Sequence, residues 1–380
     1  MSNSRGRLVE LDSLRGIAAL SVVLFHSLLT VKLSDSAIHR LIDALPTHPL
    51  FAGRMAVIFF FVLSGVVLTR GLMKDESGPF PIRLLLFAAR RVVRLCVPVA
   101  AVLGLSAGLY RLFWHDPSLG PLLYGGWNAP PDAKEFIRQA FLIGMDGDFF
   151  LDPALWSLVH ELRFSLVLPF IVAMPCFRGI QGSISLVLAG LVVFGLSLSG
   201  HADIEASVSV GSTVSETLRA TAYFALPFLA GSALSLGSWD QWQPNADQRK
   251  VGLAAALLLL CTNNNVTTVI AAVLLILLSG YAGAYQNFLR SPVLRLLGRI
   301  SFSLYLVHIP IQLAVQHSLH ALLSEASMEL LTIALSLLAA WIVNILIEQP
   351  AQRLSKKIAL PRFTSGSATV REFPKNLNNA

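Results

Sequence analysis

The stretch LDSLRGIAALSVVLFHS, residues 11–27, opens an apolar segment that continues to about residue 33. A segment of this length and apolarity is typical of a membrane-spanning helix. Two of its residues, Arg15 and His26, are out of place in such a helix. They are eleven positions apart, which on an α-helix is three turns plus about 20°, so both side chains share one face about 16 Å apart. We therefore expect one stripe of a membrane helix to carry polar chemistry.

The composition of the whole chain is also typical of a membrane protein. Of its 380 residues, 54% are hydrophobic and only 13% are charged, whereas soluble domains carry about 25% charged residues. The three cysteines, Cys96, Cys176 and Cys261, lie in or beside apolar segments without metal or redox spacing, which favours core positions. The first apolar segment lacks a small-residue cleavage pattern, so we do not expect a cleavable signal peptide.

Ten apolar segments are candidate spans of an all-α transmembrane helix bundle. They lie near residues 14–33, 54–73, 92–113, 154–175, 182–199, 218–237, 250–262, 266–284, 301–322 and 328–348. The segment at 250–262 is short for a 30 Å membrane core and is followed by Asn263–Asn265, which predicts a tight turn. The two alternatives for this segment are a full span and a half-span. We expect one membrane domain over residues 1–358 and a short, polar, disordered tail over 359–380.

The distribution of charge predicts the orientation. The loop after the second span, with its flanks, is basic, and the loop after the third span is acidic. The basic residues are Arg70, Lys74, Arg83, Arg90, Arg91 and Arg94; the acidic ones are Asp116, Asp132, Glu135, Asp146, Asp148 and Asp152. By the positive-inside rule, both termini lie in the cytoplasm and the chain is a multi-pass protein of the inner (cytoplasmic) membrane. The net charge of +7 therefore needs no nucleic-acid partner.

Ionisable residues from several spans are expected at similar depth. At about 1.5 Å per residue, His26 lies roughly 18 Å from the cytoplasmic edge and Glu161 roughly 10 Å below the outer edge. These depths nearly coincide in a core about 30 Å thick, and Arg163 and Ser64 fall near the midplane. Such residues normally face a protein interior or a water-filled cavity. The same count puts His308 at roughly 12 Å, which is shallower, so it need not act together with His26.

Six blocks of sequence resemble motifs of one family. They are the run from Arg15 to His26; FFFVLSGVVLTR, residues 59–70; RVVR, residues 91–94; LWSLVHELRFSLVLP, residues 155–169; GRISFSLYLVHIP, residues 298–310; and IEQPAQRLSKK, residues 347–357. In this order they resemble the acyltransferase-3 family of membrane acyltransferases, which includes O-acetylases of bacterial polysaccharides and lipopolysaccharides. The resemblance covers about residues 8–358.

Two departures from the family pattern bear on mechanism. Asp12-Ser13-Leu14-Arg15-Gly16 has serine where the common opening has glycine, and Leu162 stands where many members carry a second acidic residue after Glu161. The extracytoplasmic domain that some members carry at the C-terminus is absent from this sequence. The resemblance implies transfer of an acyl group, usually acetyl, from a CoA thioester to a sugar hydroxyl, with acyl-CoA as co-substrate and no bound cofactor or metal.

The resemblance, together with the residue chemistry, identifies candidate site residues. The candidate catalytic residues are His26, Glu161 and Arg15, and the candidate donor- or substrate-binding residues are Arg91, Arg94, Ser64, Arg163, Tyr305 and His308. A hydroxyl is a poor nucleophile at neutral pH, and a buried neutral histidine is suited to take its proton, so His26 is the expected general base. The alternative is a core histidine hydrogen-bonded to a neighbouring helix.

Each of the other charged candidates also has more than one possible role. Arg15, Arg91 and Arg94 would bind CoA phosphates or simply anchor the protein at the membrane surface. Glu161 would orient His26, bind an acceptor hydroxyl, or pair with Arg163 or an arginine of another span, although residues two apart on one helix do not face each other.

The candidates with hydroxyl, imidazole or aromatic side chains also have alternative roles. Ser64 would be a nucleophile or a close-packing position. His308 would bind the donor or hydrogen-bond Tyr305. Trp114, Tyr124 and Trp127 would contact a sugar or lie at the interface, and Glu348 is expected to be structural.

We therefore expect an integral membrane acyltransferase, with acyl-CoA entering from the cytoplasm and a carbohydrate or lipid-linked acceptor approaching from outside. The alternative is a transporter or export factor for a glycan or small solute, in which the polar stripe moves protons or solute. Inverted repeats and unwound half-spans would favour that alternative, and the sequence shows no convincing case of either.

Overall fold

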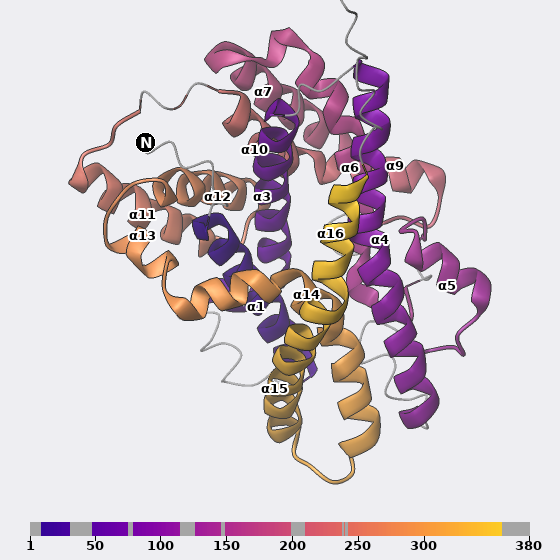
Figure 1. Cartoon of the computed structure of the whole chain (residues 1–380). Helices are drawn as coiled ribbons and strands as arrows, with labels where there is room; N and C mark the ends of the chain where they lie inside the picture. Colours follow the sequence, from indigo (N-terminus) through magenta and orange to yellow (C-terminus); the bar gives the residue numbers. More distant parts are fainter. Residues whose placement is uncertain are drawn as a thin grey trace, which may run out of the picture.

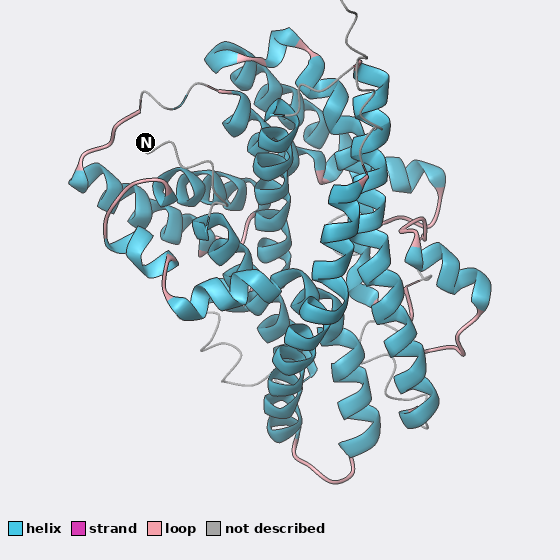
Figure 2. Ribbon diagram, in the orientation of Figure 1, coloured by secondary structure: helices cyan, strands magenta, loops and turns pink. Residues whose placement is uncertain are grey.

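The computed structural model describes residues 9–30, 48–74, 79–114, 126–145, 149–198, 210–237, 239 and 242–358, and every regular element within them is helical (Figures 1 and 2). The fold class is therefore the predicted all-α bundle. The predicted tail at 359–380 and the residues Tyr124, Asp116, Asp146 and Asp148 lie outside the described residues.

Seven segments of the described chain are long and apolar enough to cross a membrane. They are α1 (Val9–Thr30), α3 (Gly53–Lys74), α4 (Phe80–Phe113), α6 (Trp156–Ala173) with the preceding turn η3 (Pro153–Leu155), α7 (Gly179–Leu198), α14 (Pro292–Leu319), and α15 (Glu325–Val343) continued by the π-helix η6 (Asn344–Glu348) and α16 (Gln349–Lys357). The remaining elements are η1 (His48–Phe51), α5 (Ala133–Ala140), η4 (Pro175–Phe177), α9 (Val214–Tyr223), α10 (Ala225–Leu236), α11 (Ala246–Leu260), α12 (Asn265–Ser279) and α13 (Ala284–Leu289).

The count of ten spans is not confirmed, because three predicted spans form shorter helices. The segment predicted at 218–237 is divided at Phe224 into α9 and α10. The 12 residues of α10 and the 15 residues of α11 and of α12 extend only about 18–22 Å, less than a membrane core. The predicted turn after α11 is present, with Asn263 in the left-handed region (φ 51) and Asn264 capping α12.

Glycine pairs allow two helix crossings to be unusually close. A Cβ on Gly16 of α1 would lie 2.5 Å from the backbone nitrogen of Gly298 in α14, and a Cβ on Gly65 of α3 would lie 2.2 Å from the carbonyl oxygen of Phe228 in α10. Helices in membranes associate through such small residues because backbones can then approach. Gly65 is thus a packing position, and α1, α3 and α14 form a tight core beside α4 and α6.

The C-terminal segment forms one wall of this core. Glu325–Lys357 runs as one nearly continuous helical rod through α15, η6 and α16, and α16 packs along α4 (Figure 1). The wider turn of η6 re-aims the side chains that follow it, a feature often found at functional sites. This rod and α4 enclose one side of a cavity whose other walls are α1, α3, α6 and α14.

The predicted external loop contributes a buried aromatic cluster. Trp127 is fully buried, its ring stacks on His317, and its indole N–H donates to Ser106 Oγ at 3.0 Å. Trp114 stacks on Tyr110 near the end of α4. Because Trp127 packs inward, it does not present its ring to a sugar at the surface.

Candidate active site

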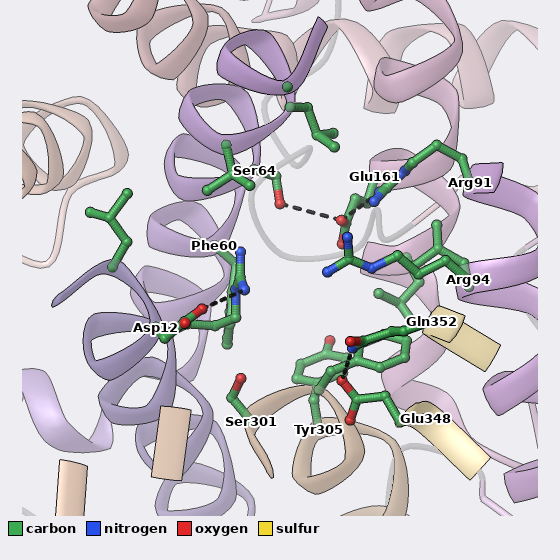
Figure 3. A pocket seen from close by; sticks show the side chains of 18 of the residues that line it. Asp12, Phe60, Ser64, Arg91, Arg94, Glu161, Ser301, Tyr305, Glu348 and Gln352 are labelled. Carbon is green, nitrogen blue, oxygen red and sulfur yellow. Dashed lines mark hydrogen bonds and ion pairs between the residues drawn. The ribbon is translucent and has the colours of Figure 1, made fainter. Parts of the chain in front are cut away.

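A cavity of about 480 Å³ lies between the helices that carry the motif blocks (Figure 3). Its walls combine apolar side chains of α3, such as Phe60 and Phe61, with many charged groups. The lining cations are Arg15, Arg70, Lys74, Arg91, Arg94, Arg299 and Lys356, and the lining anions are Asp12, Glu161 and Glu348. The lining therefore carries an excess of positive charge, which attracts anions.

Glu161 of α6 lies at the centre of the polar contacts. Its Oε1 accepts a hydrogen bond from Arg91 Nη2 at 2.7 Å and one from Ser64 Oγ at 3.3 Å (Figure 3). The sequence alternatives for Glu161 included an ion pair with an arginine of another span, and Arg91 on α4 is that arginine. Arg163 points elsewhere and donates to Thr221 Oγ1 at 2.9 Å, as expected for residues two apart on one helix.

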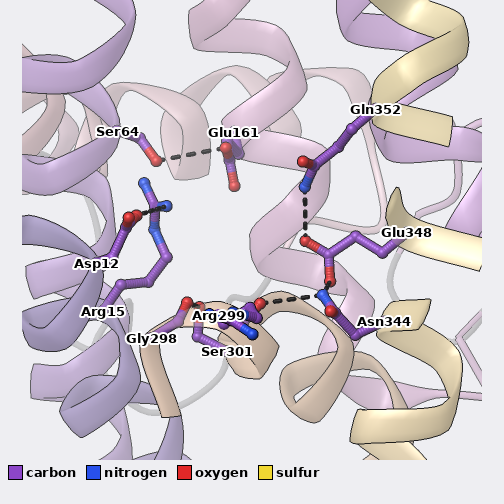
Figure 4. Close-up of polar contacts among 10 residues, drawn as sticks. All are labelled: Asp12, Arg15, Ser64, Glu161, Gly298, Arg299, Ser301, Asn344, Glu348 and Gln352. Carbon is purple, nitrogen blue, oxygen red and sulfur yellow. Dashed lines mark hydrogen bonds and ion pairs between the residues drawn. The ribbon is translucent and has the colours of Figure 1, made fainter. Parts of the chain in front are cut away.

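Two further arginines face the same space. Arg15 of α1 pairs with Asp12 at 3.5 Å, and its guanidinium extends towards Ser64 and Glu161 (Figure 4). Arg94, one turn after Arg91, also lines the cavity, and no carboxylate of the described residues lies within ion-pair distance of it. Arg15 of α1 and Arg91 and Arg94 of α4 therefore line the same cavity.

Glu348 is held rigidly on the opposite wall. Its carboxylate accepts hydrogen bonds from Asn344 Nδ2 at 2.7 Å and Gln352 Nε2 at 2.8 Å (Figure 4). It also accepts one from Ser303 Oγ at 2.6 Å. These contacts tie α14, η6 and α16 together, so Glu348 has the expected structural role. It also keeps Gln352 in the cavity wall.

Tyr305 of α14 closes one end of the cavity. Its hydroxyl donates to the carbonyl oxygen of Ala154 at 2.9 Å, and because its single proton is used there, Ser157 Oγ donates to it at 2.7 Å. The Tyr305 ring packs edge-on against Phe60. These contacts fix the ring between the cavity and the residues that follow on α14.

His26 and His308 form a pair directly beyond Tyr305. Nε2 of His308 lies 3.3 Å from Nδ1 of His26, and the His308 ring centroid lies 5.7 Å from that of Tyr305. The expectation that His308 lies shallower than His26 was wrong. Because α14 begins at Pro292 rather than near residue 301, His308 lies about 24 Å along its helix, and His26 about 26 Å along α1.

With this geometry in view, comparison with known proteins identifies the family. A family model described as an acyltransferase domain, that of acyltransferase-3, matches residues 8–347. The chain belongs to the acyltransferase-3 family. No curated protein and no solved structure matched it. The protein is accordingly a membrane acyltransferase.

In this acyltransferase-3 protein the motif blocks meet around one space. The blocks of α1, α3, α4, α6, α14 and α16 each place at least one side chain in the cavity lining. The histidines of the first and fifth blocks are the exception, since neither occurs among the described residues that line the cavity. The site therefore has two parts, a cationic cavity and a histidine pair, with Tyr305 between them.

Sequence reasoning missed the polar residues that surround the histidine pair. Gln312 Nε2 donates to the His26 carbonyl oxygen at 3.2 Å and to Glu329 at 3.0 Å, and Gln316 donates to the same carboxylate at 2.9 Å. Gln312 and Gln316 follow His308 at helical spacing, and Glu329 is an acidic residue in an apolar helix, so both signals were present in the sequence. No group of acidic, cysteine or histidine residues within the described chain is arranged to hold a metal ion.

Proposed function

We propose that this acyltransferase moves an acyl group, in the simplest case acetyl, from a coenzyme A thioester to a hydroxyl of a carbohydrate or lipid-linked acceptor. The observation that carries the proposal is the cationic cavity, which the ring of Tyr305 separates from the histidine pair. Cations suit the phosphates of the donor, and a neutral histidine suits the deprotonation of a hydroxyl.

The donor would occupy the cavity with its charged end towards the basic ends of α3 and α16. Arg94 is available to a phosphate group because no described carboxylate pairs with it, whereas Arg91 is held by Glu161. The inner part of the cavity, lined by Phe60, Ser64 and Ser157, mixes apolar surface with hydroxyl groups. That mixture suits the uncharged pantetheine arm, which is largely apolar but contains two amide groups.

The hydrogen bonds of the histidine pair indicate which nitrogen of His26 is basic. Nδ1 of His26 lies 2.9 Å from the carbonyl oxygen of Val22, and Nδ1 of His308 lies 2.7 Å from that of Tyr305. A carbonyl oxygen only accepts, so each neutral ring carries its proton on Nδ1. Nε2 of His26 then holds the lone pair, and Nε2 of His308 accepts from His26 and would stabilise its imidazolium form.

The proposed reaction is balanced without a further reactant. Nε2 of His26 takes the proton of the acceptor hydroxyl while that oxygen attacks the thioester carbonyl carbon. The carbon–sulfur bond breaks, and the departing thiolate takes the proton from His26 to become the thiol of coenzyme A. The Tyr305 ring would have to leave its contacts with Ala154, Ser157 and Phe60 to let the thioester pass from the cavity to His26. Glu161 acts by positioning Arg91, and Arg15 completes the cationic wall on the His26 helix.

The proposed orientation follows from the charges. The basic ends of α3, α4 and α16 would face the cytoplasm, where acyl-CoA is found, in the inner membrane, with both termini cytoplasmic. The acceptor would reach His26 from the outer side, through the region of Gln312 and Glu329. Arg163, which contacts Thr221 on α9, would contribute to that side.

Replacement of His26 tests the proposal. Transfer of radiolabelled acetyl from acetyl-CoA to the glycan and lipid fractions of membranes is measured for the wild type, His26→Ala, His26→Gln and the buried control His160→Gln. We expect both His26 variants to lose about 10²–10⁴-fold in rate at unchanged membrane abundance, and the control to retain activity.

The comparison of Gln with Ala separates chemistry from packing. Gln keeps volume and hydrogen bonding but does not accept a proton with useful strength, whereas a structural histidine would tolerate Gln better than Ala. Near-normal transfer by His26→Gln would overturn the assignment of the base. Loss of glycan export with acetylation intact would replace the proposal with the transporter alternative.

A further inference from the structure

The cations that line the cavity differ in how their charge is balanced. Arg91 is paired with Glu161 and Arg15 with Asp12. Lys74 and Lys356, which we call the mouth lysines, are exposed, line the same cavity, and have no carboxylate of the described residues within ion-pair distance. A ligand phosphate at the mouth lysines would therefore gain Coulomb attraction without displacing a carboxylate.

The mouth lysines belong to different walls of the cavity. Lys74 is the last residue of α3 and Lys356 lies in the last turn of α16, and both helices end towards the top of Figure 1. Arg70 lies one turn before Lys74 on the same lining face. Ser64 is ten residues before Lys74, so the mouth lies about 15 Å along α3 from the inner ion pair.

We infer that Lys74 and Lys356 form a phosphomonoester subsite at the mouth of the cavity, which binds the 3′-phosphate on the ribose of coenzyme A. This inference rests on the proposed function, because it names the part of the donor that the outer cavity recognises. Two lysines on different walls provide separate point charges for one dianionic group. Arg94 then remains for the pyrophosphate, and the protein distinguishes coenzyme A from its 3′-dephospho form.

Anionic lipid headgroups share the same phosphate chemistry, and lysines at helix C-termini also interact favourably with the helix dipole. Lys357 serves as a matched control for these general effects. It is adjacent to Lys356 on α16, carries the same charge and is exposed, but it does not line the cavity. A substitution there removes one basic charge from the same membrane surface and leaves the subsite intact.

The test is equilibrium binding of coenzyme A and of 3′-dephospho-coenzyme A to the full-length protein in phosphatidylcholine nanodiscs. We expect the wild type to bind coenzyme A about 10- to 100-fold more tightly, the scale of two partly solvated charge-assisted contacts. Lys74→Gln/Lys356→Gln should remove this preference and leave binding of the dephospho form unchanged. Lys357→Gln should keep it.

Four results would overturn the inference. The first is equal binding of coenzyme A and its 3′-dephospho form by the wild type, and the second is equal weakening of the binding of both compounds in the double variant. The third is loss of the preference in Lys357→Gln. The fourth is loss of the preference when phosphatidylglycerol is added, which would assign the lysines to lipid headgroups.

Acetyl transfer measured in parallel separates the two proposals. A 3′-phosphate preference without transfer refutes the proposed function alone, and transfer without the preference refutes the subsite alone.

Discussion

The ion pair between Arg91 and Glu161 permits a prediction in which the two partners are not equivalent. The Arg91 side chain is 7% exposed and that of Glu161 is 20% exposed. Glu161→Gln leaves a buried guanidinium without its carboxylate and with Arg94 one turn away. Arg91→Gln leaves a carboxylate that still contacts Ser64 and still interacts with Arg15 and Arg94.

The expected losses of unfolding free energy differ because the two partners are buried to different extents. Removing one partner of a buried ion pair lowers the free energy of unfolding by about 3–5 kcal/mol because the other charge remains buried. Glu161→Gln should approach the lower end of that range, about 3 kcal/mol. Arg91→Gln should cost only about 1 kcal/mol, because the remaining carboxylate faces the cavity and other cations. The double variant should resemble Arg91→Gln, which gives a coupling free energy of about 2–3 kcal/mol.

Thermal unfolding of the purified protein in detergent is the assay. At roughly 2–4 °C per kcal/mol, Glu161→Gln should lower the Tm by several degrees more than Arg91→Gln. If Arg91→Gln were the more destabilising variant, or if the two effects simply added in the double variant, the reasoning from burial and neighbouring charge would be refuted.

Two further predictions concern positions away from this pair. Gly16→Ala places a Cβ 2.5 Å from the backbone of Gly298 and should lower both Tm and acetyl transfer. The control Gly104→Ala, whose Cβ meets nothing within 4 Å and which lies outside the cavity lining, should be neutral or slightly stabilising. Similar Tm values for the two variants would show that α1 and α14 are not held by this contact. Burial raises the pKa of the Asp152 carboxyl from its ordinary value near 3.8 to about 8, so the folded protein retains a proton that the unfolded chain loses, and stability should fall as pH rises from about 4 to about 8. Asp152→Asn keeps an oxygen that accepts from the Ala154 amide and should flatten the dependence of Tm on pH over that range. An unchanged slope in this variant would contradict the assignment of the pH dependence to the Asp152 carboxyl.

The candidate site was only partly predictable from the sequence. Helical periodicity placed Arg15 and His26 on one face, and the count of residues along each span placed His26, Glu161, Arg163 and Ser64 at similar depth. Helix ends were less predictable. Starting α14 near residue 301 rather than at Pro292 made His308 seem too shallow to meet His26, because each residue of error shifts the depth by about 1.5 Å.

What the sequence determined by itself is the class of the protein. Hydropathy and the basic and acidic loops are properties of residue types and spacing, and they predicted an all-helical membrane protein. The resemblance of the ordered motif blocks to the acyltransferase-3 family predicted the acyltransferase. These patterns carry no information about which side chains meet across helices. The pairing of Arg91 with Glu161, the position of Tyr305 between cavity and histidines, and the lack of a described carboxylate partner at Lys74 and Lys356 were decided only by the tertiary structure. The physical reason is that the rotation and depth of a helix depend on close contacts with its neighbours, such as the glycine crossings of α1 with α14 and of α3 with α10, and on the π-helix before α16. These contacts decide which polar side chains meet.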